Sequence, residues 1–191
     1  IVKGWLTEMS TEVTSLGVQV HGGMGFIEET GAAQHYRDAR ITAIYEGTTG
    51  IQALDLVGRK LLRDGGQAMS ALISEMEADA ANLPGSLENL ATQLSAGIDT
   101  LKQASSWLMA NAGEDYLADT AAFNLLMLGG YVCGAWQMAR AAALAVARED
   151  QIFYRNKRIT AQFYCDHLLP RAAAHLAAIK AGAESTMAVE F

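Results

Sequence analysis

The segment SLENLATQLSAGIDTLKQASSWL, residues 86–108, decides the fold class of this chain. Its large apolar residues recur every three or four positions, the spacing that places side chains on one face of an α-helix: Leu87, Leu90, Leu94, Ile98, Leu101 and Leu108. Ser86 is a suitable N-cap for such a helix. We therefore predict a long amphipathic helix that packs by this face against other helices.

The composition of the whole chain extends this prediction to an all-α fold. Among 191 residues, 34 are alanine and 21 leucine, against 18 valine and isoleucine together, and β-branched side chains lose conformational freedom in a helix. Two prolines make a sandwich or barrel with many turns improbable. Collagen-like, disordered and disulfide-scaffold classes are excluded on the same figures. The length suits one or two domains.

Residues 66–191 are predicted to form an additional carboxy-terminal helical bundle, distinct from residues 1–65. One helix is marked by apolar residues between Met69 and Met76, and others are expected over 86–108, 116–148 and 152–183. Short loops between four helices are typical of an antiparallel bundle. Pro170 should kink or restart the last helix. Gly130 and Gly134, four residues apart, would let another helix approach closely.

Three features limit the classes of protein to which this chain can belong: its charge, one apolar run and its cysteines. The chain has 14 basic and 21 acidic residues, a balance that argues against a nucleic-acid-binding surface. The run Leu125–Trp136 covers about one-half to two-thirds of a bilayer span, so we predict a buried helix of a soluble protein and no membrane span. Cys133 and Cys165 lack CxxC spacing, and we interpret them as buried free thiols of a cytoplasmic protein.

The first 65 residues contain shorter helices punctuated by glycines. An amphipathic pattern is already under way at Val2, without an initiator Met, which leads us to expect the carboxy-terminal part of a longer chain. Its helix should run to about Val20, and a more polar one is expected from Glu29 to Arg40. After a connector over residues 41–46, a helix capped by Thr48 or Thr49 should run to Gly65–Gly66. Its predicted apolar stripe is Ile51, Leu54, Val57, Leu61 and Leu62.

Two motifs in this part are candidates for chemistry. The glycine cluster HGGMG, residues 21–25, follows a helix and so is not a dinucleotide-binding fingerprint. Its backbone N–H groups could cradle a phosphate, although a helix C-cap and turn is the simpler interpretation. In YEGTTG, residues 45–50, Glu46 precedes a helix N-terminus, where the dipole stabilises an ionised carboxylate. From spacing alone this structural role is favoured over catalysis.

Other candidate sites are weaker. His167 and His175 are eight residues apart, but Pro170 lies between them and no carboxylate completes a ligand set, so no metal site is predicted. The run RDAR, residues 37–40, is interpreted as a solvated, salt-bridged face. Neither a Ser-His-Asp arrangement nor a nucleophilic cysteine context is evident.

Taken together, the motifs resemble the carboxy-terminal signature of acyl-CoA dehydrogenases. Three strings match in order and spacing across residues 15–64, with Ile51 and Gln52 following: QVHGGMGF at 19–26, YRDAR at 36–40 and IYEGT at 44–48. Residues 66–191 resemble the extra helical domain of one branch of that family, which includes enzymes described as 3-methylmercaptopropionyl-CoA dehydrogenases. The ending from Phe163 to Glu184 is similar but less diagnostic.

The resemblance implies an oxidoreductase of fatty acid metabolism that acts on a CH–CH bond. Glu46 matches the catalytic base, which removes the α-proton of an acyl-CoA thioester while the β-hydrogen leaves as hydride to the flavin of FAD. Tyr45 and Gly47 match positions that line the acyl pocket. The matches to FAD-binding positions are Gln19, Gly22 and Gly23, which usually touch the FAD of a neighbouring subunit, and Thr48 at the diphosphate end.

One departure from the family pattern concerns the cofactor. Many members have glutamine four residues after the base, where this chain has Gly50, so Gly50 is not included in the predicted site.

The resemblance also implies partners, and it leaves alternatives open. An acyl-CoA substrate, an electron-transfer flavoprotein as electron acceptor and a homo-oligomer are expected. The chain alone should be inactive, because the helices and β-domain that supply most flavin and CoA contacts are missing. A non-catalytic helical interaction or oligomerisation module is the main alternative, and an acyl-CoA oxidase with the same base is another. The acyl chain is not predicted.

Overall fold

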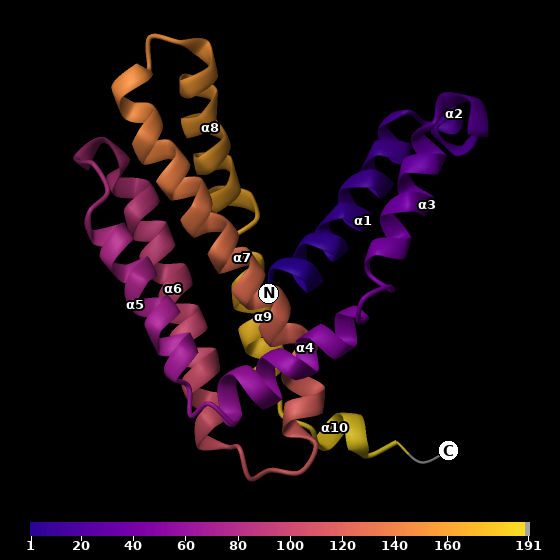
Figure 1. Ribbon diagram of the computed structural model, residues 1–191, viewed down its shortest axis with the longest axis vertical. Coiled ribbons are helices and arrows are strands. Elements are labelled where there is room, and N and C mark those ends of the chain that lie inside the picture. Colours follow the sequence, from indigo (N-terminus) through magenta and orange to yellow (C-terminus); the bar gives the residue numbers. More distant parts are fainter. Residues whose placement is uncertain (190–191) are drawn as a thin grey trace.

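The computed structural model describes residues 1–189, and within this range it contains helices and no strand. The prediction of an all-α protein is therefore confirmed. Figure 1 shows the helices arranged in a V, with a bundle on one side and a two-helix arm on the other. The two sides meet near α4 (Thr49–Val57) and the lower half of α7 (Leu117–Ala145).

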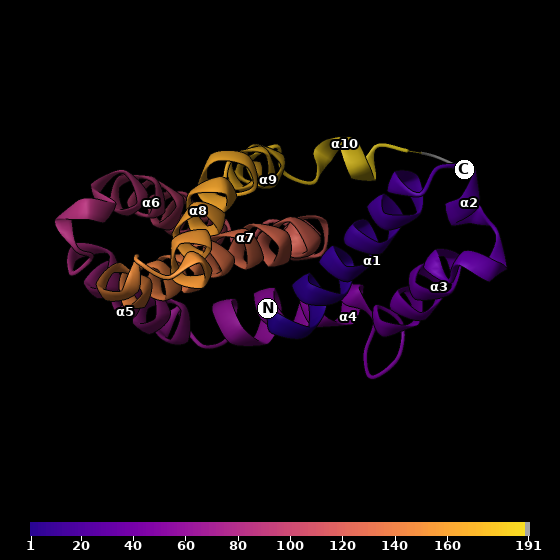
Figure 2. The ribbon, with the colours of Figure 1, turned by 90° about the horizontal axis from the view of Figure 1, so that it is seen from above.

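The arm consists of α1 (Val2–Val20), α2 (Gly23–Phe26), the 3₁₀ turn η1 (Glu28–Thr30) and α3 (Ala32–Thr42). Helices α1 and α3 lie side by side, and α2 caps the far end of the arm (Figures 1 and 2). The helix predicted from Glu29 begins later, at Ala32, because Gly31 has a φ of 80° and separates η1 from α3. A positive φ of this kind favours glycine and interrupts a right-handed helix.

Helix α4 begins as predicted. Thr48 is its N-cap, and the side-chain oxygen accepts a hydrogen bond from the backbone N–H of Ile51 at 3.4 Å. The helix continues into a π-helical turn, η2 (Gly58–Leu62), and the chain then turns at Gly65 and Gly66, both with positive φ. These glycines end the helical segment where the sequence predicted its end.

The bundle contains the remaining helices: α5 (Gln67–Ala81), η3 (Gly85–Leu87), α6 (Glu88–Ala110), α7, η4 (Val146–Arg148), α8 (Ile152–His167), α9 (Arg171–Lys180) and α10 (Glu184–Met187). Pro170 separates α8 from α9, as expected from its missing N–H. The predicted cap at Ser86 is wrong. Ser86 lies inside η3, and α6 begins at Glu88 without a side-chain cap.

Helix α7 lies at the centre of the core, packed against α4, α6, α8 and α9. The apolar run Leu125–Trp136 is buried there except for two half-buried positions, which confirms the predicted buried helix. In the described part of the chain, Leu117–Arg148 is the one helical stretch long and apolar enough to cross a membrane by length and composition. Of its most apolar window, 61% is buried in the structure, a pattern that the core helix of a soluble protein also shows.

The glycines of α7 admit other helices, as predicted. A Cβ added at Gly130 would lie 2.0 Å from Cγ of Trp5 in α1, and one at Gly134 would lie 2.1 Å from the hydroxyl oxygen of Tyr164 in α8. The Tyr164 hydroxyl donates a hydrogen bond to the backbone carbonyl of Tyr131 at 3.1 Å. Both aromatic side chains therefore occupy space that any larger residue on α7 would take.

Two predicted apolar stripes are only partly buried. In α4, Val57 and the adjoining Leu61 are in the core, whereas Ile51 is 58% exposed and Leu54 40% exposed. In α1, Trp5 and Met9 pack against the core, whereas the stripe beyond them is exposed at Val13, Leu16 and Val20. At these exposed positions, no other helix of the described chain covers the side chains, although α3 packs against another face of α1.

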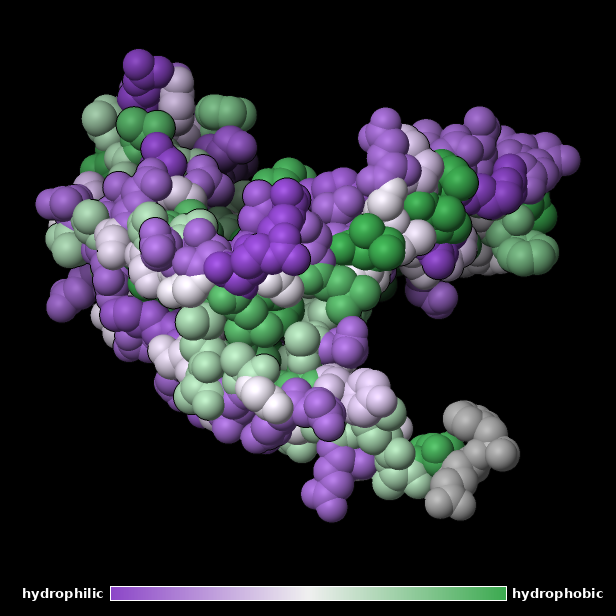
Figure 3. All heavy atoms as spheres, turned by 60° about the horizontal axis from the view of Figure 1, so that its bottom comes forward, coloured by the Kyte–Doolittle hydropathy of each residue, from purple (hydrophilic) through white to green (hydrophobic). Residues whose placement is uncertain are grey.

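Hydrophobic residues accordingly appear on the surface of the arm and of the adjoining face of the molecule (Figure 3). One continuous core cluster joins residues of α4 to those of the bundle. The boundary at residue 65 between two domains stays a prediction.

Candidate functional site

The loop between α3 and α4 holds the residues predicted to act on a substrate. Its backbone is left-handed at two successive residues, with a φ of 54° at Glu46 and of 90° at Gly47. Glycine adopts this conformation freely, but for other L-residues it costs about 1–2 kcal/mol. Among residues 1–189 the only other non-glycine residue with positive φ is Tyr116. A strained residue of this kind persists only where neighbouring groups hold it in place.

Side chains from two helices hold this loop. The Gln52 side-chain amide donates to the Glu46 carbonyl at 3.3 Å, and the Lys3 ammonium donates to the Gly47 carbonyl at 2.5 Å. The neutral bond to the Glu46 carbonyl contributes about 0.5–1.5 kcal/mol and the charge-assisted bond to the Gly47 carbonyl about 1.5–3 kcal/mol, together comparable with the strain at Glu46.

A third contact fixes the loop at the start of α4. The buried Thr49 hydroxyl donates to the Glu8 carboxylate at 2.5 Å, and the Thr49 backbone N–H donates to the Ala43 carbonyl at 3.2 Å. No role was predicted for Lys3 or Glu8 from the sequence. Each is a charged residue within one helical turn of the apolar residues of α1. Gln52 belongs to the string that carries the resemblance, and no role was predicted for it.

The predicted substrate-side residues lie together on an open surface. The side chains of Glu46 and Thr48 are exposed, Tyr45 is 52% exposed, and Gly47 is half-buried beneath them. Exposed apolar side chains adjoin this loop in the sequence on both sides, at Ile44 and Ile51. The structure thus presents a carboxylate on a held backbone, next to apolar surface that an acyl chain or another segment of protein can cover.

The predicted cofactor residues at the other end of α1 are not brought to this loop. Gln19, Gly22 and Gly23 lie at the far end of the arm, sixteen residues along α1 from Lys3 in the case of Gln19, or about 24 Å. Nothing lies within 4 Å of a Cβ placed on Gly22 or Gly23, so the backbone there is open to approach. The structure therefore places Thr48 with Glu46, and the other three cofactor residues apart.

The HGGMG motif forms the end of α1 and the turn into α2, as in the simpler interpretation. Gly22 has a φ of 60°, and its N–H bonds to the Gln19 carbonyl at 3.0 Å. Gly25 is required by close approach, because a Cβ there would lie 2.2 Å from the Val18 carbonyl oxygen. Beside the motif, Phe26 and Tyr36 help to line a hollow of about 650 Å³ with neighbouring residues of α1, η1 and α3.

The YRDAR string forms the predicted solvated face of the arm. Arg37 makes two hydrogen bonds of 2.7 Å with the Glu28 carboxylate, and these bonds lower the pKa of Glu28. Both side chains are mostly exposed. This pair therefore orders the end of the arm and contributes little to stability.

A cluster of polar and aromatic side chains joins α1 to the bundle. The Arg171 guanidinium of α9 donates to the Glu12 carboxylate at 2.7 Å and to the Tyr131 hydroxyl at 3.2 Å. These hydrogen bonds, together with the opposite charge of Glu12, raise the pKa of Arg171. Tyr131 also packs edge-on against Trp5, with ring centroids 5.8 Å apart.

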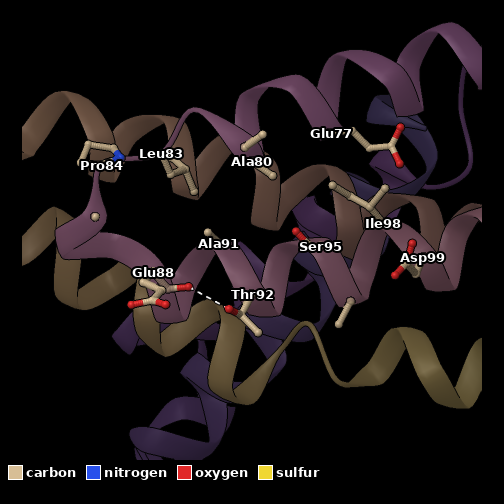
Figure 4. A pocket seen from close by; sticks show the side chains of 13 residues that line it. Glu77, Ala80, Leu83, Pro84, Glu88, Ala91, Thr92, Ser95, Ile98 and Asp99 are labelled. Atoms are coloured by element: carbon tan, nitrogen blue, oxygen red, sulfur yellow. Dashed lines mark hydrogen bonds between the residues drawn. The ribbon is translucent and has the colours of Figure 1, made fainter.

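Another hollow lies elsewhere, between α5 and α6 (Figure 4). It measures about 790 Å³, and its acidic lining residues are Glu77, Glu88 and Asp99, spaced by alanines and hydroxyl side chains. None of the predicted site residues lines it. Residues 1–189 contain no group of three His, Cys, Asp or Glu side chains placed to bind a metal ion.

Comparison with known protein families gives a match for each of the two parts of the chain. Residues 1–62 match the family model described as acyl-CoA dehydrogenase, C-terminal domain, and residues 69–190 match the model described as acetyl-CoA dehydrogenase C-terminal like. The second match covers most of the bundle, and the first covers the arm together with α4.

Individual relatives match over different extents. The chain is 42% identical to the 3-methylmercaptopropionyl-CoA dehydrogenase of Ruegeria pomeroyi over 91% of its length, and 30% identical to the broad-specificity linear acyl-CoA dehydrogenase FadE5 of Mycobacterium tuberculosis over 89%. These alignments cover 31% and 30% of the relatives, so the chain spans about a third of their length. The short-chain specific acyl-CoA dehydrogenase of Sus scrofa is 51% identical over 29% of this chain and 13% of its own length.

Proposed function

The chain belongs to the acyl-CoA dehydrogenase family, and from this premise we propose that it is the carboxy-terminal part of an FAD-dependent enzyme that desaturates acyl-CoA thioesters. Glu46 is the general base in this proposal. The observation that carries the proposal is the held, left-handed backbone at Glu46 and Gly47, with the Glu46 carboxylate projecting beside apolar surface. Functional sites are where such strain is typically retained.

The loop residues act by position and by excluding water. Glu46 accepts the α-proton of the thioester, and it becomes a stronger base when the acyl chain and the rest of the enzyme cover the exposed loop. Gly47 keeps the backbone beside the base free of a side chain, and Tyr45 forms an adjacent wall. When bound, FAD supplies the acceptor for the β-hydride, so that the α and β hydrogens leave as a proton and a hydride.

The arm fits a role in cofactor binding. No atom lies within 4 Å of a Cβ placed on Gly22 or Gly23, so the backbone there is open to approach, although the Gly22 N–H itself is bonded to the Gln19 carbonyl. Gln19 is exposed one turn before them. These groups suit the polar edge or phosphates of FAD. Gln19 lies about 24 Å along α1 from Lys3, which binds the Glu46 loop, and Gly22 and Gly23 follow the end of that helix. We therefore assign these three residues to the FAD of a neighbouring subunit, whereas Thr48 serves the FAD beside Glu46.

The proposal includes partners and a range of substrates. A shared cofactor site requires a homo-oligomer, and an electron-transfer flavoprotein is the expected electron acceptor. Relatives named for 3-methylmercaptopropionyl-CoA, butyryl-CoA and linear acyl-CoA substrates define the thioesters to test first.

The deciding experiment replaces the base in the full-length protein. Glu46→Gln keeps the shape of the side chain but cannot accept the α-proton, so we expect FAD to remain bound and its reduction by acyl-CoA to be lost. The measurement is stopped-flow bleaching of the flavin band with a panel of acyl-CoA thioesters.

Two controls accompany this variant. Glu75→Gln removes an exposed carboxylate from α5 and should reduce flavin at the wild-type rate. The 191-residue chain alone should be inactive, because Glu46 is then open to water. Near-normal flavin reduction by Glu46→Gln would refute the assignment and leave the non-catalytic interaction module as the alternative.

A further inference from the structure

The conformation of the Glu46 loop is not one that its own residues favour. Glutamate in the left-handed region relaxes readily to an extended or right-handed conformation unless other groups hold it. Such a change at Glu46 would rotate its side chain away from any fixed target. The groups that hold the loop therefore determine where the carboxylate points.

Two successive carbonyls of the loop are each bound by a side chain from a different helix. Gln52 is one turn into α4, and its amide binds the Glu46 carbonyl. Lys3 is at the start of α1, and its ammonium binds the Gly47 carbonyl. With the peptide planes on both sides of Gly47 tied, neither can turn without breaking a hydrogen bond.

Gln52 also lies directly against the glycine. A Cβ added at Gly47 would be 2.7 Å from the Gln52 side-chain nitrogen, so the amide occupies the space that a side chain at Gly47 would need. The Lys3–Gly47 hydrogen bond is partly buried, whereas the Gln52–Glu46 hydrogen bond is exposed. The contact is therefore specific in shape as well as in polarity.

The position of Lys3 depends in turn on the bundle. Two residues further along α1, Trp5 sits on Gly130 of α7, and two turns beyond Trp5 the Glu12 carboxylate is held by Arg171 of α9. Helix α1 thus connects the bundle to the Glu46 loop, because Trp5 and Glu12 contact the bundle and Lys3 binds the loop.

We infer that Lys3 and Gln52 are positioning residues that aim the Glu46 carboxylate at the substrate, with the bundle fixing Lys3 through α1. This inference rests on the proposed function. Neither side chain is assigned contact with the acyl chain or the cofactor. Their removal should slow proton abstraction and leave the binding of both ligands largely intact.

The test uses the full-length protein with bound FAD. Lys3→Met and Gln52→Ala remove the two donors, and Lys157→Met and Gln137→Ala remove the same groups from exposed positions on α8 and α7. For each variant, flavin reduction is followed over a range of acyl-CoA concentrations, which separates the limiting rate from the apparent Kd. The flavin-to-protein ratio and the thermal midpoint are measured in parallel.

The expected result is a fall of tenfold or more in the limiting rate for Lys3→Met and for Gln52→Ala, with the apparent Kd and FAD content within twofold of wild type. A merely structural role would instead lower the FAD content or the thermal midpoint. Wild-type limiting rates in both variants, alongside loss of reduction in Glu46→Gln, would overturn the inference while leaving the proposed function intact. Normal reduction in Glu46→Gln would overturn both.

If Lys3→Met loses FAD, the Lys3→Arg variant distinguishes a positioning role of Lys3 from a merely structural one. Arginine keeps a charged donor at this position, so we expect FAD content to recover and the limiting rate to return to within threefold of wild type. A Lys3→Arg variant that binds FAD normally but reduces it as slowly as Glu46→Gln would contradict positioning through this hydrogen bond.

Discussion

At the scale of single residues, Gly47 and Glu46 show two different causes of an unusual backbone. Gly47 is required twice over, by its φ of 90° and by the Gln52 amide that fills the place of a Cβ. Glu46 has no intrinsic preference for its φ of 54°, and its conformation depends on hydrogen bonds from outside the loop. The positive φ of Gly47 can be anticipated from the glycine in the sequence, whereas that of Glu46 cannot.

The two cysteines give a prediction at the same scale. Both are free, and burial raises the pKa of the Cys133 and Cys165 thiols to about 11 each. The thiolate is the reactive form, so at about pH 8 each thiol should react roughly a hundredfold more slowly than an ordinary cysteine. We expect iodoacetamide to label neither cysteine in the native protein and both in denaturant, as read by peptide mass spectrometry.

A reference thiol makes this measurement quantitative. Ser106→Cys adds a cysteine on the exposed face of α6, which should be labelled at the rate of a free thiol. Labelling of native Cys133 or Cys165 as fast as this reference would show that the thiol is not protected. Reactivity should rise as the pH approaches 11, because the fraction of thiolate increases there.

At the scale of elements, the contact between α1 and α7 depends on the absence of a side chain. Trp5 lies where a Cβ of Gly130 would be, and Gly4 of α1 similarly accommodates Leu126 of α7. Close packing at these positions brings α1 against the core even though most of its outer stripe is exposed.

Gly130→Ala should therefore destabilise the protein despite the better helix propensity of alanine. The new methyl group would overlap the Trp5 ring, and overpacking of a rigid core costs about 1–3 kcal/mol or more. We expect a loss of about 3 kcal/mol in the free energy of unfolding, measured by urea denaturation.

The matched control is Gly58→Ala in η2. Gly58 has a φ of −69°, and nothing lies within 4 Å of the position that an added Cβ would take. Alanine should therefore stabilise the protein by about 0.4–1 kcal/mol through the unfolded state. Equal shifts of the urea midpoint in the two variants would contradict the packing of Trp5 on Gly130.

At the scale of the whole molecule, the arm separates the two groups of proposed site residues. Its end projects away from the bundle (Figure 2), and the Glu46 loop lies at its base. Within one chain, Gln19 lies about 24 Å along α1 from Lys3, which binds the Glu46 loop. This separation favours the proposed sharing of FAD between subunits.

Hybrid oligomers test this sharing. Gly23→Glu places a carboxylate in the open space at the end of the arm, where it should repel the FAD diphosphate, and Glu46→Gln removes the base. Each variant alone should be inactive. Co-expression should restore about a quarter of wild-type activity, because half of randomly paired symmetric dimers are hybrids with one intact site of two.

The readout is acyl-CoA-dependent flavin reduction by the co-purified mixture. A mixture made after separate purification, without subunit exchange, serves as the control. Activity in co-expressed hybrids no higher than in that control would contradict a shared site.

Much of the fold followed from local pattern. Most helices could be located from apolar residues that recur every three or four positions and from the turns at Gly22, Gly65–Gly66 and Pro170. These signals are local, because helix propensity and turn chemistry act within a few residues of the chain. Local rules failed at Ser86, where η3 takes up the cap position, and at Gly31, which divides the helix predicted from Glu29.

The sequence by itself determined the all-α class, the family strings and the candidate base Glu46. Only the tertiary structure decided what holds that base, since Lys3 and Gln52 reach it from helices whose relative placement depends on long-range packing. It likewise decided that Ile51 and Val13 remain uncovered and that Gln19 lies far from Glu46. Periodicity specifies that a helix has an apolar face, but which neighbour covers that face depends on contacts between residues distant in the sequence.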